Sequence, residues 1–94
     1  GVLLVKKNKD ITSGILTDGD LKRLAQKFDN FTNLKISNVM KKNPISVEKN
    51  MLASQALYIM NKKKITCLCV HSGNKIKNTV GIIHIHNILN ANIS

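Results

Sequence analysis

The sequence predicts a small mixed fold, α+β or α/β, built from two related copies of one strand–strand–helix unit. With 94 residues, 43% of them apolar, the chain can bury one modest core and is too apolar for a disordered tail. Apolar runs of strand length alternate with segments whose apolar residues recur at helical spacing. In addition, Gly-Ile-Leu-Thr at residues 14–17 recurs as Gly-Ile-Ile-His at residues 81–84, each time before a predicted helix.

The first half of the chain predicts two strands and a helix. Residues 2–5 form a continuous apolar run before a polar turn, which is typical of a buried strand, and a second strand is expected over about residues 12–16. A helix then begins near Asp18. Its apolar positions are spaced three and four apart and predict one inward stripe: Leu21, Leu24, Ala25 and Phe28.

The second half predicts the order short helix, strand, helix, strand, strand, helix. A short helix around residues 36–40 can be capped by Ser37, and Pro44 ends it before a strand at residues 45–47. Asn50 is expected to cap a helix over residues 51–63. Its inward residues are Leu52, Ala56, Ile59 and Met60. Strands follow over residues 65–70 and 80–83, and the last helix begins at about His86.

The two copies of the repeat can be matched residue by residue. Gly14 corresponds to Gly81, Thr17 to His84, Asp20 to Asn87 and Leu21 to Ile88. The second copy is complete, whereas the first lacks its opening strand and helix, so the chain holds one and a half repeats. We expect the two copies to pack about a pseudo-two-fold axis, since each half-sheet has an apolar face to cover. The residues expected to be buried there are Leu3, Val5, Ile15, Leu68, Val70 and Ile82.

The composition excludes several classes of protein. A net charge of +10 favours phosphorylated ligands or nucleic acid, yet the lysines are scattered, and an aromatic content of 3% argues against a platform for stacked bases. A basic nucleic-acid-binding domain therefore remains a rival supported by charge alone. No uncharged apolar run approaches the ~20 residues of a membrane helix, so no membrane partner is expected.

The two cysteines are expected to be buried thiols on one face of a strand. Cys67 and Cys69 are two residues apart, which is not the spacing of a metal knuckle, and we expect no metal site. Few cysteines and no signal peptide indicate a reducing cytoplasm. Because the chain starts with Gly1 inside a strand-like run, we expect a fragment of a longer protein.

The repeated motif resembles that of cystathionine-β-synthase-type (CBS) domain pairs. The motif of that family is a Gly, two apolar residues, Thr or Ser, two variable positions and Asp, and residues 14–20, Gly-Ile-Leu-Thr-Asp-Gly-Asp, satisfy all of it. Residues 14–23, 38–40, 43–44 and 81–86 are further similar to the C-terminal CBS pair of bacterial arabinose-5-phosphate isomerases. In those enzymes the pair follows a sugar-isomerase (SIS) domain.

The resemblance implies a domain organisation. Residues 1–30 would be the C-terminal half of a first CBS motif, residues 31–36 a linker and residues 37–94 a complete second motif. The two motifs would be β-α-β-β-α-type units, the first of them incomplete.

The resemblance also implies the residues that would contact a ligand. In nucleotide-binding CBS pairs the motif Asp holds the ribose hydroxyls and the Thr meets the phosphate side, positions occupied here by Thr17 and Asp20. The second motif departs from the pattern, with His84 for Thr and the neutral Asn87 for Asp; these two and Ile45 are its candidate contacts. The alternative is capping alone, since a Thr-x-x-acid arrangement stabilises a helix start by about 1 kcal/mol without any ligand.

The function implied is that of a regulatory module. No acid–base pair lies beside a phosphate-binding cradle, so we expect no catalytic residue in this chain. The parent would be a cytoplasmic isomerase interconverting D-ribulose 5-phosphate and D-arabinose 5-phosphate for Kdo and lipopolysaccharide synthesis. The module would require no cofactor, bind an adenine or cytidine nucleotide or a nucleotide-sugar, and help to form a homo-oligomer. The alternative parents are another enzyme or transporter with an adenine-nucleotide-sensing CBS module, or a stand-alone CBS protein.

Overall fold

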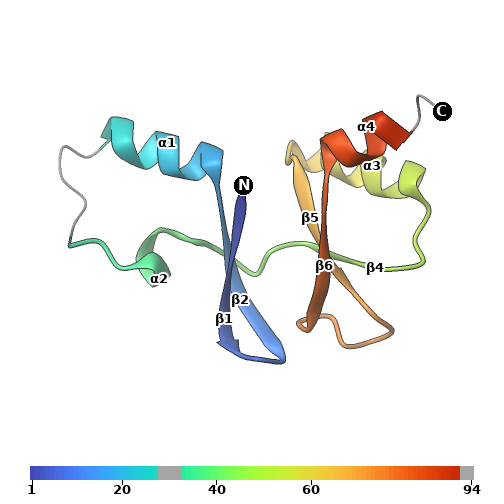
Figure 1. Ribbon diagram of the computed structural model, residues 1–94, viewed down its shortest axis with the longest axis horizontal. Helices are drawn as coiled ribbons and strands as arrows, with labels where there is room; N and C mark the ends of the chain where they lie inside the picture. The colour runs from blue at the N-terminus through green and yellow to red at the C-terminus, as the bar shows by residue number, and fades with distance from the viewer. Residues whose placement is uncertain (28–32, 92–94) are drawn as a thin grey trace. The chain divides into compact units, whose positions relative to one another are not determined.

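The computed structural model describes residues 1–27 and 33–91, which fold as two compact units, Gly1–Pro44 and Ile45–Ser94. Figure 1 shows the elements of both. In chain order they are β1 (Val2–Asn8), β2 (Ile11–Thr17), α1 (Asp18–Lys27), α2 (Ile36–Val39), β3 (Lys41–Lys42), β4 (Ser46–Glu48), α3 (Ala53–Lys63), β5 (Cys67–His71), β6 (Thr79–His84) and α4 (Ile85–Ala91). Among the described residues, no helix is both long and apolar enough to cross a bilayer.

The first unit is a three-stranded antiparallel sheet in the order β1-β2-β3, with α1 continuing directly from β2. A tight turn joins β1 to β2, and the Asn8 side chain accepts a hydrogen bond there from the Asp10 N–H at 2.9 Å. Strand β3 was not predicted, because two lysines after a short helix carry no strand signal. The start of the expected linker, residues 31–32, and Phe28 lie outside the described residues.

A glycine in the centre of β2 allows β3 to pair closely. A Cβ atom on Gly14 would overlap the sulfur of Met40 and would lie 2.7 Å from its Cγ and 3.0 Å from the Lys41 carbonyl oxygen. A Cβ atom on the corresponding Gly81 of the second unit would lie 3.9 Å from the Cβ of Val70, which is an ordinary contact distance. The repeated glycine is therefore sterically required in the first unit only.

The second unit is a mixed sheet in the order β4-β5-β6, in which β4 runs parallel and β6 antiparallel to β5. A parallel pair needs a crossover connection, which α3 supplies. Helices α3 and α4 pack on one face of this sheet (Figure 1). The core there consists of Val47, Ala56, Met60, Leu68, Val70 and Ile88.

Two predicted helix caps are wrong. Helix α3 begins at Ala53, after Leu52, with no side-chain cap. Asn50 instead belongs to a turn in which its N–H donates to the Glu48 carboxylate at 2.6 Å. Likewise, α2 begins at Ile36 after Lys35, so Ser37 lies inside the helix and does not cap it. The polar residue with capping propensity thus lies in the turn before α3 and inside α2.

The predicted burial is correct for the central strands and wrong for several flanking positions. Ile15, Leu68 and Val70 are buried, Val5 and Ile82 are half-buried, and Leu3 is 51% exposed. Leu3 pairs with the buried Leu16, but β1 is an edge strand and has a neighbour within its unit on one side only. On the helices, the predicted inward residues Leu21, Ala25 and Leu52 are exposed, Leu24 and Ile59 are half-buried, and Ala56 and Met60 are fully buried.

The glycine asymmetry yields a paired prediction. Gly14→Ala should lower the free energy of unfolding of the first unit by about 1–3 kcal/mol, because Met40 and β3 must move. The matched Gly81→Ala should cost less than about 1 kcal/mol, since the added methyl group meets ordinary contacts. Urea denaturation, with amide exchange to separate the two units, measures both values. Equal costs at the two sites would contradict the close approach of β3.

Candidate functional site

The two strand-to-helix junctions that carry the repeated motif are built in the same way. At the end of β2, the backbone N–H of Thr17 donates to Oδ2 of Asp20 at 3.0 Å. At the end of β6, the backbone N–H of His84 donates to Oδ1 of Asn87, also at 3.0 Å. In each unit the acceptor is the third residue of the following helix. The two junctions therefore share one local hydrogen-bond geometry.

The first junction is a complete capping box. The Thr17 hydroxyl donates to Asp20 Oδ2 at 3.0 Å, and the Asp20 N–H donates back to Thr17 Oγ1 at 3.3 Å. Two backbone N–H groups that would otherwise lack partners are satisfied in this way. Thr17 and Asp20 therefore cap α1. Capping does not by itself indicate whether they also contact a ligand.

Asp20 is a buried, ionised carboxylate with two cations beside it. It is 7% exposed. Its Oδ1 accepts from Nη2 of Arg23 at 2.6 Å and lies 3.4 Å from Nζ of Lys41 on β3. Burial opposes the charged form, but the Thr17 N–H, Arg23 and the Thr17 hydroxyl donate to it and the Lys41 charge is close. Together they lower the pKa of Asp20 to about 2.

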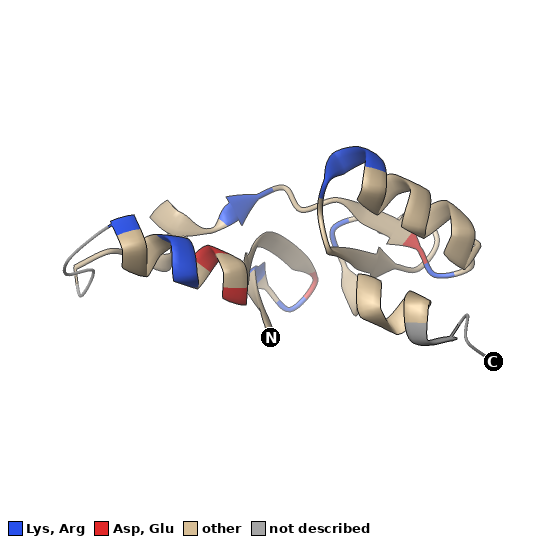
Figure 2. Ribbon diagram, turned by 90° about the horizontal axis from the view of Figure 1, so that it is seen from above, with Lys and Arg blue, Asp and Glu red and all other residues tan. Residues whose placement is uncertain are grey.

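Sequence reasoning missed both cations. Arg23 lies three residues after Asp20 on a helix, a spacing at which opposite charges meet, so the sequence did contain that signal. Lys41 is far from Asp20 in sequence and reaches it only because β3 pairs with β2 at Ile15. Figure 2 shows the acidic residues at the start of α1, the basic residues further along it, and the basic strand β3.

The second junction has the same backbone hydrogen bond as the first, but its side chains are of different types. Asn87 is neutral and exposed, in contrast to the buried Asp20. The ring of His84 is stacked on that of His86, with centroids 4.8 Å apart and planes 18° apart. The His86 N–H also donates to Nδ1 of His84 at 3.3 Å. This junction therefore presents an amide and a pair of imidazoles where the first presents a carboxylate.

Ile45 lies at the same end of the second sheet as His84. It immediately precedes β4, is 38% exposed, and its carbonyl accepts from the Cys69 N–H at 3.0 Å. The neighbouring strand begins with Cys67, which pairs with His84 at the end of β6. Three of the predicted site residues, Ile45, His84 and Asn87, thus gather at one end of the second unit, and the other two, Thr17 and Asp20, belong to the first.

Cys67, Cys69 and His71 of the second unit all lie on β5. His71 is buried, and its Nδ1 lies 2.6 Å from the Ser46 hydroxyl on the adjacent strand. Both cysteines are free thiols; burial raises the pKa of Cys69, although a hydrogen bond with Thr79 acts in the opposite direction. Within residues 1–27 and 33–91 we find no cluster of His, Cys, Asp and Glu side chains suited to a metal ion.

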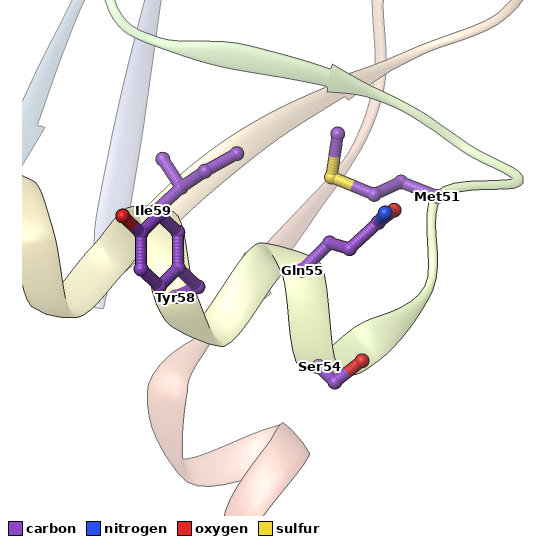
Figure 3. A pocket seen from close by; sticks show the side chains of 5 residues that line it. All are labelled: Met51, Ser54, Gln55, Tyr58 and Ile59. Carbon is purple, nitrogen blue, oxygen red and sulfur yellow. The ribbon is translucent and has the colours of Figure 1, made fainter.

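A shallow hollow lies beside α3 and the residues just before it. Met51, Ser54, Gln55, Tyr58 and Ile59 line it (Figure 3). Its lining includes no charged side chain, and Tyr58 is largely exposed and lies beneath the ammonium group of Lys62. A phosphorylated ligand would find no cation in the lining, so the strand-to-helix junctions are the better candidates for such a ligand.

Comparison with known families agrees with the repeated motif. Residues 36–94 match the model of the CBS domain. The chain belongs to the CBS domain family. Its fold is the mixed α/β fold of CBS pairs, with two small sheets.

The curated relatives of this CBS chain are longer proteins. It is 39% identical over 80 residues to the arabinose 5-phosphate isomerase KdsD of Yersinia pestis, covering 85% of this chain and 24% of the relative. It is 36% identical over 94 residues to the uncharacterised protein RP505 of Rickettsia prowazekii, covering all of this chain and 28% of that protein. The chain thus spans about a quarter of the length of the curated relatives that it matches.

Solved CBS structures share the fold at low sequence identity. The CBS-domain protein ATU1752 of Agrobacterium tumefaciens is 24% identical with a TM-score of 0.84, covering 98% of this chain and 71% of that one. The CBS pair of protein MJ0100, in complex with 5′-methylthioadenosine and S-adenosyl-L-methionine, is 23% identical with a TM-score of 0.78 and covers 96% and 68%. CBSX2 in complex with AMP is 19% identical with a TM-score of 0.77 and covers 98% and 70%.

The lowered pKa of Asp20 predicts an acid-dependent loss of stability. Because the folded-state pKa is about 2 and the ordinary value is 3.8, the ionised carboxylate stabilises the fold above pH 3.8 and this contribution is lost as the pH falls toward 2. The loss should be about 2 kcal/mol. In urea unfolding between pH 5 and 2, Asp20→Asn lacks this titration, so its stability should approach that of the wild type as the pH falls. A constant difference would show that Asp20 is not stabilised as an anion.

Proposed function

We propose that this CBS module binds an adenine nucleotide and that Asp20 and Thr17 are its contacts at the first junction. The observation that carries the proposal is the buried, ionised carboxylate of Asp20 at a strand-to-helix junction, with Arg23 and Lys41 beside it. A carboxylate accepts hydrogen bonds from ribose hydroxyls, and the two cations attract a phosphate group. The AMP complex of CBSX2 and the adenosine-containing ligands of the MJ0100 pair support adenine as the base.

The second junction offers a weaker set of contacts for the same class of ligand. Asn87 can hydrogen-bond a hydroxyl group as a neutral acceptor, and His84 can meet a phosphate when it is protonated. Ile45 adds an exposed apolar side chain at that end of the sheet for a base to contact. A cytidine nucleotide or a nucleotide-sugar is the alternative ligand, since neither junction contains a group that reads one base uniquely.

We propose an arabinose-5-phosphate isomerase as the parent protein. The match to KdsD supports this assignment, although it covers only about a quarter of that enzyme. In the proposed parent, an SIS domain in another part of the chain carries out the aldose–ketose isomerisation in the cytoplasm, and this module regulates it and joins its homo-oligomer. Residues 1–30 and 37–94 are then the partial first and complete second CBS motifs, with residues 31–36 between them. A stand-alone CBS protein or a module of another enzyme or transporter is the alternative, and the gene sequence upstream of Gly1 distinguishes them.

Asp20→Asn tests the ligand site. Loss of charge-assisted hydrogen bonds should weaken AMP binding by about 1–3 kcal/mol. Stability at neutral pH should fall by no more than about 2 kcal/mol, the contribution of the ionised carboxylate, because Asn still caps the helix. The matched control is Asp10→Asn, which removes the same charge from an exposed turn and should leave binding almost unchanged. Isothermal titration calorimetry with AMP and CMP measures both, and binding should weaken as salt is added.

The outcomes separate the two readings of the motif. If the wild type binds neither nucleotide at millimolar concentration, capping alone explains Thr17 and Asp20. If wild type and Asp20→Asn bind equally, the ligand lies at the second junction, near Ile45, His84 and Asn87.

A further inference from the structure

We infer that Arg23 covers the oxygen of Asp20 that a ligand must reach, and so makes this site select phosphorylated nucleotides over nucleosides. The inference rests on the proposed function, in which Asp20 accepts ribose hydroxyls. It concerns residues of the first unit only, all of them within Gly1–Pro44. Lys41 contributes to the same cover from β3.

Three protein donors hydrogen-bond to the Asp20 carboxylate, and a lysine ammonium group lies close to it. A carboxylate offers about four lone-pair directions, two on each oxygen. Oδ2 accepts from the Thr17 N–H and the Thr17 hydroxyl, both at 3.0 Å. Oδ1 faces Nη2 of Arg23 at 2.6 Å and Nζ of Lys41 at 3.4 Å. A ribose hydroxyl that approaches Oδ1 therefore competes with these two cations for the oxygen.

The donors on Oδ1 are the ones that can leave. The Thr17 N–H is held at the end of β2, and the Thr17 hydroxyl also accepts from the Asp20 N–H, so both belong to the helix start. The side chains of Arg23 and Lys41, by contrast, are 65% and 58% exposed. Moving such long side chains into water breaks an ion pair of modest strength and leaves the helix start intact. Oδ1 is therefore the oxygen that a ligand would take over.

The displaced guanidinium distinguishes two kinds of ligand. A nucleoside replaces Arg23 on Asp20 and offers the cation no new acceptor, so the lost ion pair counts against binding. A nucleotide carries a phosphate, which a guanidinium binds through paired N–H groups, and this contact offsets the loss. Arg23 thus weakens the binding of nucleosides and strengthens the binding of nucleotides. A cation that acted only through the local electrostatic potential would not weaken nucleoside binding.

The test compares AMP with adenosine in two matched variants. Arg23→Met removes the guanidinium and keeps a long side chain with good helix propensity. Lys22→Met removes the same charge one residue earlier on α1, where the cation acts on Asp18. Calorimetric titration of the wild type and both variants gives the ratio of AMP affinity to adenosine affinity, and thermal unfolding confirms that each variant is folded.

The expected result is a change of opposite sign for the two ligands. In Arg23→Met, adenosine should bind about three- to tenfold more tightly and AMP about three- to tenfold more weakly than in the wild type. Lys22→Met should leave the ratio of the two affinities close to that of the wild type. Arg23→Lys, which keeps the charge but lacks the paired donors, should give an intermediate ratio and serves if the Met variant does not fold.

Two results would overturn the inference while leaving the proposed function intact. Weaker AMP binding with unchanged adenosine binding in Arg23→Met would assign Arg23 to a general electrostatic attraction of the phosphate. Weaker adenosine binding in that variant would show that Arg23 positions Asp20 and does not cover it. If no variant binds either compound, the proposed function fails, and this inference fails with it.

Discussion

A single hydrogen bond, repeated in both units, sets the direction in which each helix leaves its sheet. The side chain of the third helical residue accepts from the backbone N–H of the last strand residue, Asp20 from Thr17 and Asn87 from His84, at 3.0 Å in each case. In each unit the backbone N–H of the last strand residue donates to this side chain. The helix can then begin at the next residue without an intervening loop. The placement of α1 and α4 depends on this bond.

The two units stabilise that junction in different ways. The second unit has a continuous apolar core beneath α3 and α4, centred on the fully buried Met60 and Leu68. In the first unit, the buried apolar residues among those described are Ile15 and Leu16 on β2, beside the buried polar Thr12 and Asp20. There the Asp20 carboxylate connects three elements, since its partners come from the end of β2, from α1 and from β3. Charge and hydrogen bonding take over part of the role that apolar packing has in the second unit.

This difference explains why the carboxylate is both a structural and a functional candidate. A buried anion is stable only when hydrogen bonds and nearby cations compensate its burial, and Asp20 has three hydrogen bonds and two cations beside it. Two of its partners, Arg23 and Lys41, are exposed long side chains, whereas the Thr17 donors belong to the helix start. Asn87 is neutral and exposed. It accepts the same hydrogen bond, from the His84 N–H, but carries no charge that cations would need to balance. The second motif therefore has the same local geometry as the first, but its side chains differ in charge.

The sequence by itself determined the order of the elements, the repeat and the pairing of Thr17 with Asp20. These features rest on contacts between residues a few positions apart, which hydrophobic periodicity and capping patterns express directly. The two helix caps at Ser37 and Asn50 were wrong, because the backbone conformation, and not the capping propensity of a nearby residue alone, decides where a helix starts. The exposure of Leu3 and Leu52, the strand β3 and the approach of Lys41 to Asp20 were decided by the tertiary structure. They depend on which strand lies at an edge and on pairing between segments far apart in the chain, and no local pattern encodes either.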